Sequence, residues 1–289
     1  MKRHRLVVLG FIILAPLQVS FLTYAQTSTA EPERISPAGF PSKPSTFPDA
    51  SQDTASKIEQ FDQRDVSWKL LIPNILQDQK RIWLFPKKWF QGKDLIPTGA
   101  FVAGTTGLVV LDPYTAPYFR KTQAYSQFNR IVSSKNAVIG MIAVPLTAYG
   151  VGLVRHDSYL QGTALLTGEA VIDSELLTQV LKATTRRLLP EYIPPNGNFR
   201  DSWFHNHSGP WYTAPGSFPS GHMIAATSIA TVFARRYGRK HRWVPWVAYG
   251  LAGVVAFSRL TLSAHFPSDV FAATFLGYTI ARYDVLTNP

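Results

Sequence analysis

Three short segments in the C-terminal half carry residue types whose spacing suits the transfer of a phosphoryl group. The first is Pro219-Ser220-Gly221-His222, the second is Ser258-Arg259, and the third runs from His265 to Asp269. Phosphoryl transfer requires fixed cations, N–H donors, a nucleophile and a proton source for the leaving oxygen. The segments together supply two histidines, one arginine and one carboxylate. We expect them to meet in one pocket.

The Ser220-Gly221 turn precedes an apolar run that predicts a helix, from Met223 to Phe233. The free N–H groups at the start of a helix, together with its positive end, attract an anion. Ser268 is expected to cap a second helix directly before Asp269. The sequence therefore predicts an anion cradle built from helix starts.

These residues resemble the type 2 phosphatidic acid phosphatase superfamily, which also includes bacterial acid phosphatases and vanadium-dependent haloperoxidases. Pro-Ser-Gly-His matches the second motif of the family. Ser-Arg, five residues, His, three residues and Asp match its third motif. The resemblance covers about residues 162–280 and implies an all-α fold, a helical bundle of about six core helices.

The resemblance also implies a role for each residue. His265 would attack phosphorus to form a phosphohistidine, and Asp269 would fix the tautomer of His265 and support its positive charge. His222 would protonate the departing alkoxide and later activate water. No metal and no cofactor are implied. The phosphate would be bound by Lys182, Ser220, Gly221 and Arg259.

The first motif of the family, Lys, six residues and Arg-Pro, is incomplete in this chain. Lys182 and Pro190 stand at the expected spacing, but Leu189 occupies the arginine position. Arg186 would share a helical face with Lys182 and could deliver a guanidinium one turn earlier. The alternative is Arg187, which would reach in if the helix ends before Pro190. If neither arginine substitutes, the phosphate site is weakened.

The composition narrows the classes of partner. The 289-residue chain has a net charge of +11 and no cysteine. A positive charge suits an anionic partner, while the absence of zinc-finger spacing, RNA-binding signatures and long basic runs argues against nucleic acid. The expected partner is a phosphate-ester or lipid-phosphate substrate, with membrane contact. The oligomeric state is not indicated.

The N-terminus predicts export to the cell envelope, in the periplasm or at the membrane. Basic residues 2–5 precede an uncharged stretch, 6–25, which is typical of a secretory signal peptide or an N-terminal anchor. Residues 26–62 are rich in Ser, Thr, Pro and Ala and predict a disordered or linker leader. Residues 63–289 would form the phosphatase-like helical domain.

Apolar stretches within that domain predict its helices, and their many small residues permit close helix contacts. Three stretches approach the length that spans a membrane, 95–111, 136–154 and 244–257. An embedded protein and a soluble bundle both remain open. The aromatic and basic segment 66–90 predicts a helix at a membrane surface or one that closes over the core. The further predicted helices are 162–189, 223–233 and 270–280.

Residues 191–218 lack periodicity, and we expect this long loop to border the pocket and shape substrate choice. His205 and His207 alternate within it but lack a third metal ligand at helical spacing. Asn206-His207-Ser208 matches a glycosylation acceptor. Glu169 and Asp173 share a helical face and are interpreted as structural.

The leading hypothesis is an exported, metal-independent phosphatase that acts on phosphomonoesters or on lipid phosphates and pyrophosphates. One alternative is a vanadate-dependent haloperoxidase, because the same cradle can hold vanadate. The other is a non-catalytic anion-binding or lipid-binding membrane protein of the same fold, for which Leu189 is the only support.

Overall fold

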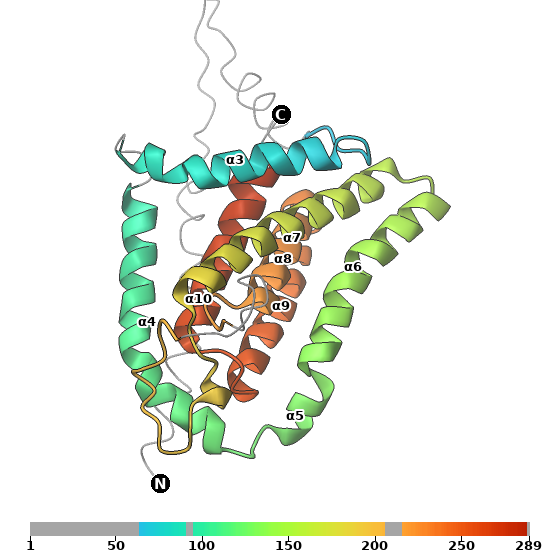
Figure 1. The fold of residues 1–289 in the computed structure, drawn as a ribbon. Coiled ribbons are helices and arrows are strands. Elements are labelled where there is room, and N and C mark those ends of the chain that lie inside the picture. Colours follow the sequence, from blue (N-terminus) through green and yellow to red (C-terminus); the bar gives the residue numbers. More distant parts are fainter. Residues whose placement is uncertain (1–63, 91–94, 206–215, 288–289) are drawn as a thin grey trace, which may run out of the picture. The chain divides into compact units, whose positions relative to one another are not determined.

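The computed structural model describes residues 64–90, 95–205 and 216–287. The predicted signal peptide and the leader lie outside the described residues. Within the described ranges the chain forms helices and turns without a β-strand. This confirms the predicted all-α fold, a bundle whose main helices correspond to the six predicted core segments (Figure 1).

Most helices follow one another with short connections, apart from the long segment between α7 and α8 that contains η3. The described elements are α3 Leu71–Phe90, α4 Leu95–Lys121, α5 Ser126–Ile131, α6 Ser134–Val154, α7 Ser158–Thr185, η3 Pro190–Tyr192, α8 Gly221–Tyr237, α9 Val244–Thr261, α10 Pro267–Thr279 and the terminal turn η5 Ile280–Val285.

The helix α8 lies at the centre of the bundle, where it packs against α6, α7, α9 and α10. Small residues let these helices approach closely. A Cβ atom at Gly277 of α10 would lie 2.5 Å from the carbonyl oxygen of Ile224 in α8. Only glycine therefore fits where α10 crosses α8. On its other side, α10 packs against α4.

Two predicted helix ends differ from the structure. The segment 162–189 was expected to be helical to its end, but α7 stops at Thr185 because Arg186 takes a left-handed conformation with φ 44°. Ser268 was expected to cap α10, yet it lies inside that helix and Phe266 holds the cap position. Both differences change which side chains can reach the predicted pocket.

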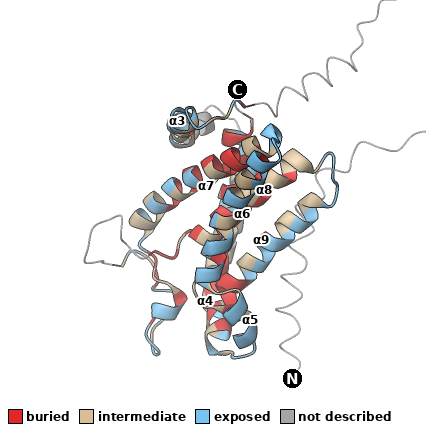
Figure 2. Cartoon of the chain, turned by 90° about the vertical axis from the view of Figure 1, so that its right-hand side faces the viewer, coloured by how far each residue is buried: buried red, intermediate tan, exposed pale blue. Residues whose placement is uncertain are grey.

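Three helices are long and apolar enough to cross a membrane, namely α4, α6 and α9. Few residues of their most apolar windows are buried inside the protein. Figure 2 shows exposed residues along α6 and α9, and the exposed side chains include Leu146 and Leu251. Such apolar surfaces are expected to face lipid. The chain is therefore associated with a membrane.

The helix α3 packs against α7 and η5 through buried polar contacts. Asn74 donates a hydrogen bond to Glu169 at 2.9 Å, and Gln79 donates to Asp173 at 2.9 Å. Arg64 forms an ion pair with Asp78 at 2.6 Å. Glu169 and Asp173 thus join α3 to α7, away from the predicted phosphate site.

Candidate functional site

The elements that carry the predicted site residues meet at one end of the bundle (Figure 1). The helices α7 and α9 end there, and α8 and α10 begin there. A helix start presents free N–H groups and positive potential, so this end suits an anion. The residues lie as follows: Lys182 in the last turn of α7, Ser220 at the cap of α8, Gly221 and His222 in its first turn, Arg259 in the last turn of α9, His265 in the following turn and Asp269 in the first turn of α10.

The start of α8 forms the expected cradle. The Ser220 hydroxyl accepts a hydrogen bond from the backbone N–H of Met223 at 3.4 Å. A Cβ atom built on Gly221 would lie 3.6 Å from the Lys182 ammonium nitrogen. A Cβ atom on Gly216 would lie 2.9 Å from Cβ of Lys182. The lysine side chain therefore runs between the loop and the start of α8, and its ammonium lies beside the cradle.

Arg259 and His222 are both anchored on the first residue of α6, Ser134. Arg259 Nη1 donates to the Ser134 hydroxyl at 2.9 Å, and His222 Nε2 donates to the Ser134 carbonyl at 3.3 Å. Arg259 also donates to the hydroxyl of Ser258. Among the described residues Arg259 has no carboxylate partner within 4.0 Å. Its positive charge is therefore available to an anion.

The pKa of His222 is lowered from 6.5 to about 4. Burial of the ring is the largest cause, followed by the positive charge of Arg259, and Lys182 contributes in the same direction. The imidazole is thus neutral above about pH 4 while the site is empty. A bound phosphate would offset these cations and raise the pKa of His222 again.

His265 presents one ring nitrogen to the protein and leaves the other for chemistry. Nδ1 donates to the carbonyl oxygen of Ser217 at 2.8 Å, while Asp269 Oδ2 is 3.7 Å away. A carbonyl can only accept, so Nδ1 carries the proton and Nε2 keeps its lone pair. Burial lowers the pKa of His265, against the negative charge of Asp269. Ser217, and not Asp269 as expected, makes the hydrogen bond that fixes the tautomer.

Asp269 is held from two sides. Its Oδ2 atom accepts from the backbone N–H of Phe266 at 2.8 Å, and its Oδ1 atom accepts from Arg187 Nη1 at 2.6 Å. Because both oxygens are bound, the carboxylate has a fixed orientation. It provides a stationary negative charge near the His265 ring.

Arg187 links α10 to α4. Its Nη1 atom also donates to the Ser268 hydroxyl at 2.6 Å, and its Nη2 atom donates to Asp112 at 2.6 Å. The guanidinium lies 3.8 Å from the ring centre of Phe266, and Arg187, Asp112 and Asp269 are fully buried. Two carboxylates thus neutralise and orient one buried cation.

The structure separates the two arginines that could replace the residue missing at Leu189. Arg186 is exposed, and its Nε atom donates to the Ala183 carbonyl next to it. The prediction that Arg186 shares the Lys182 face is wrong, because α7 ends before it. Arg187 does reach inward, but four of its five N–H donors bind Asp112, Ser202, Ser268 and Asp269. The cations beside the cradle are therefore Lys182 and Arg259.

Sequence reasoning missed four residues of this region. Asp112 carried a usable signal, since a single carboxylate in a membrane-length apolar helix is expensive unless it has a partner. Ser134 and Ser217 act partly through backbone carbonyls, which no residue pattern reveals. Glu175 lies close to Gly221, as a Cβ atom there would be 3.3 Å from its Oε1 atom.

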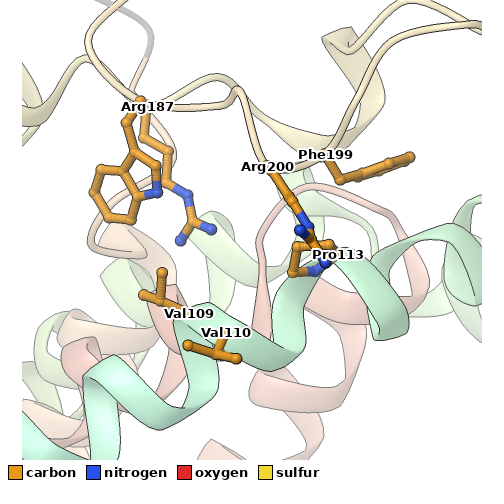
Figure 3. Close-up of a pocket in the computed structure, with 7 residues that line it drawn as sticks. Val109, Val110, Pro113, Arg187, Phe199 and Arg200 are labelled. Atoms are coloured by element: carbon orange, nitrogen blue, oxygen red, sulfur yellow. The ribbon is translucent and has the colours of Figure 1, made fainter.

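A cavity of about 370 Å³ lies beside Arg187, between α4 and the segment that follows α7 (Figure 3). Arg187 and Arg200 are the charged residues at its wall, and the rest of the lining is apolar or aromatic. Part of the predicted loop 191–218 lines this cavity, but none of the predicted site residues does. The lining residues are Val109, Val110, Pro113, Arg187, Phe199, Arg200 and Trp203.

The remaining candidates of the loop lie away from this network or outside the description. His205 approaches the Asp201 carbonyl within its own turn. His207 and the predicted glycosylation acceptor Asn206-His207-Ser208 lie outside the described residues.

The part of the chain that carries the site resembles known proteins. Residues 162–287 match the family model described as "PAP2 superfamily". Three lipid A 1-phosphatases are similar in sequence. The protein of Porphyromonas gingivalis is 34% identical over 70 residues, 24% of this chain and 16% of that protein. The protein of Rhizobium johnstonii is 32% identical over 117 residues, which are 40% of this chain and 43% of that protein. The protein of Rhizobium etli is 31% identical over 107 residues, which are 37% of this chain and 42% of that protein.

The chain thus spans less than half the length of these relatives. Among solved structures, a transmembrane PAP2-type phosphatidylglycerolphosphate phosphatase from Bacillus subtilis aligns with a TM-score of 0.37 and 21% identity. The alignment covers 71% of this chain and 92% of that chain.

Proposed function

We propose that this chain belongs to the PAP2 superfamily, whose model its residues 162–287 match, and that it is a metal-independent phosphatase acting on lipid phosphates. One observation carries the proposal: the ends of α7 and α9 and the starts of α8 and α10 bring Lys182, Arg259, His222 and His265 to one end of the bundle. The names of the three lipid A 1-phosphatases support a lipid substrate.

In the first step, the Nε2 atom of His265 attacks phosphorus and the bond to the leaving oxygen breaks. The Nδ1 proton stays on the ring, bound to the Ser217 carbonyl at 2.8 Å, so the imidazole ring of the phosphohistidine is positively charged. The fixed carboxylate of Asp269, whose Oδ2 atom lies 3.7 Å from Nδ1, stabilises that positive charge. The arrangement therefore favours attack by His265 and stabilises the intermediate.

His222 donates the proton that the leaving alkoxide needs. The free ring is neutral because burial and Arg259 lower its pKa to about 4. A substrate that enters as the phosphate monoanion raises the pKa of His222 through its negative charge, and it supplies the proton that the ring takes up. In the second step His222 takes a proton from water, and the hydroxide attacks phosphorus to release phosphate and free His265.

Lys182, Arg259, the Ser220 hydroxyl and the N–H groups at Gly221 and His222 would bind the phosphoryl oxygens. These groups are held before substrate arrives, by the loop at Gly216 and by Ser134. Fixed donors stabilise developing charge without having to reorganise during the reaction. Arg187 does not bind phosphate in this mechanism, but positions Asp269.

The membrane helices fit a lipid substrate. The site lies at one end of α4, α6 and α9, the three helices able to span a bilayer, which would bring it close to the membrane surface. The cavity beside Arg187 adjoins α4, and the apolar part of its wall would accept an apolar part of the substrate. A phosphate at the surface and a chain in the cavity would then be bound together.

We further propose that residues 1–25 direct export, that residues 26–62 form a leader, and that 63–289 form the catalytic domain. Sequencing the N-terminus of the protein recovered from its host would test the cleavage, and protease protection in spheroplasts would test the side of the membrane. A protein that retains residue 1 and faces the cytoplasm would contradict export.

The direct test is release of phosphate by the purified full chain in detergent. Phosphatidate, lipid A, isoprenyl pyrophosphate and a soluble aryl phosphate should be compared, with His265→Ala as the control. We expect turnover of at least one lipid phosphate and none by the variant. Binding of orthovanadate without any turnover would instead support an anion-binding protein, and turnover of the aryl phosphate alone would support a soluble-ester phosphatase.

A further inference from the structure

A carboxylate lies beside the phosphate cradle that the proposed chemistry does not use. Glu175 precedes Lys182 by seven residues on α7, a spacing that places both side chains on one helical face. A Cβ atom built on Gly221 would lie 3.3 and 3.4 Å from the two Glu175 carboxylate oxygens and 3.6 Å from the Lys182 ammonium nitrogen. Glu175 and Lys182 therefore flank the first residue of α8.

Glu175 differs from the other acids near the site. Asp112 and Asp269 are fully buried and bound to Arg187, so their charges are offset. Glu175 is only partly buried, and within the part of the chain that the structure describes its carboxylate has no hydrogen bond and no ion pair within 4.0 Å. Burial raises its pKa, against the positive charge of Lys182.

We propose that Glu175 sets the charge of the phosphate site: its carboxylate offsets the Lys182 ammonium and weakens the binding of dianionic phosphate, the product. This inference rests on the proposed phosphatase function. A site with uncompensated cations would hold inorganic phosphate tightly and release it slowly. A carboxylate at the cradle lowers that affinity, and it disfavours the doubly charged product more than a singly charged substrate.

The test compares Glu175→Gln with the unaltered enzyme, using inorganic phosphate and orthovanadate as competitive inhibitors. The amide keeps the size and removes the charge. We expect the inhibition constant for phosphate to fall on the order of tenfold. The variant removes the negative charge of Glu175, which would lie several ångströms from the bound phosphate in a partly buried site. Asp65→Asn, an exposed residue outside the bundle end that carries the site, makes the same change of charge and should leave the constant unaltered.

An unchanged or higher inhibition constant for phosphate in Glu175→Gln would overturn the inference. A loss of turnover without tighter phosphate binding would also overturn it, since Glu175 would then act on the substrate or on a proton. Binding of inorganic phosphate can also be measured directly, as the rise in melting temperature that phosphate causes in each variant. This measurement separates a failure of the Glu175 inference from a failure of the proposed function. If the unaltered protein neither binds nor releases phosphate, the proposed function fails first.

Discussion

Arg187 donates a hydrogen bond to Asp269 at 2.6 Å, although the two residues are 82 positions apart in the chain. The same guanidinium binds Asp112 in α4, so a single cation joins the loop after α7 to two helices. This contact orients the carboxylate that lies near His265. The same contacts use donors of Arg187, which the sequence suggested as a candidate phosphate ligand.

Arg187→Met should destabilise the protein by about 3–5 kcal/mol, because it leaves two buried carboxylates without their cation. Thermal or denaturant unfolding measures this effect. Arg186→Met is the matched control, since its side chain is exposed and it should change stability by less than about 0.5 kcal/mol. Equal losses in the two variants would contradict the network.

Arg187→Lys keeps the charge but loses the branched set of donors. If Arg187 positions Asp269, kcat should fall in the folded variant while the inhibition constant for phosphate stays within about twofold. A large loss of phosphate affinity with kcat preserved would identify Arg187 as a phosphate ligand instead.

Leu189→Arg should tighten the inhibition by phosphate by about tenfold, because it adds a charge-assisted donor to a site whose cations are Lys182 and Arg259. Arg186→Ala should leave the inhibition constant unchanged, since Arg186 points to its own turn. Competition kinetics with phosphate and orthovanadate measure both. A variant with Leu189→Arg that binds phosphate no better would mean that position 189 does not face the cradle.

His222→Ala should slow the hydrolysis of an alkyl phosphate by about 10²- to 10⁴-fold, because an alkoxide needs a proton as it leaves. The loss should be much smaller for nitrophenyl phosphate, whose leaving group is stable without a proton. Single-turnover rates for the two esters measure the difference. His265→Ala, which lacks the nucleophile, should lose both activities. Equal losses for both esters in His222→Ala would remove its role as the acid.

Asp173→Asn should make the stability of the fold less dependent on pH. Burial raises the pKa of Asp173 from 3.8 to about 8, with the charges of Asp78 and Glu169 acting in the same direction and Gln79 opposing them. The folded protein thus retains a proton that the unfolded chain loses, so this group lowers stability as pH rises from about 4 to 8. Melting temperatures between pH 5 and 9 should fall less steeply in the variant. An identical slope would contradict a protonated Asp173.

Val109→Trp should fill part of the cavity beside Arg187 and raise KM for phosphatidate by about tenfold, with little effect on a soluble aryl phosphate. Val102→Trp is the matched control on the same helix, because Val102 does not line the cavity. Equal changes for the lipid and soluble esters would show that the cavity does not hold the chain of the lipid.

The sequence alone predicted the helical class, the approximate helices and the residues on which the proposed chemistry depends. Apolar runs of helical length predict α4, α6 and α9, and the Ser220-Gly221 turn predicts the start of α8. These features depend on neighbouring residues, whose spacing is visible in the chain. The two histidine motifs have the same property, because each lies within one turn and the helix ends directly beside it.

Only the tertiary structure decided which long-range partners the site residues take. The left-handed turn at Arg186 ends α7 early, and the chain then directs Arg187 toward Asp112 and Asp269, neither of which is close to it in sequence. Ser217 and, toward His222, Ser134 act through carbonyl oxygens, whose direction depends on the backbone path. A buried charge takes whichever opposite charge the packing brings within reach, and side-chain spacing along one chain does not encode that choice.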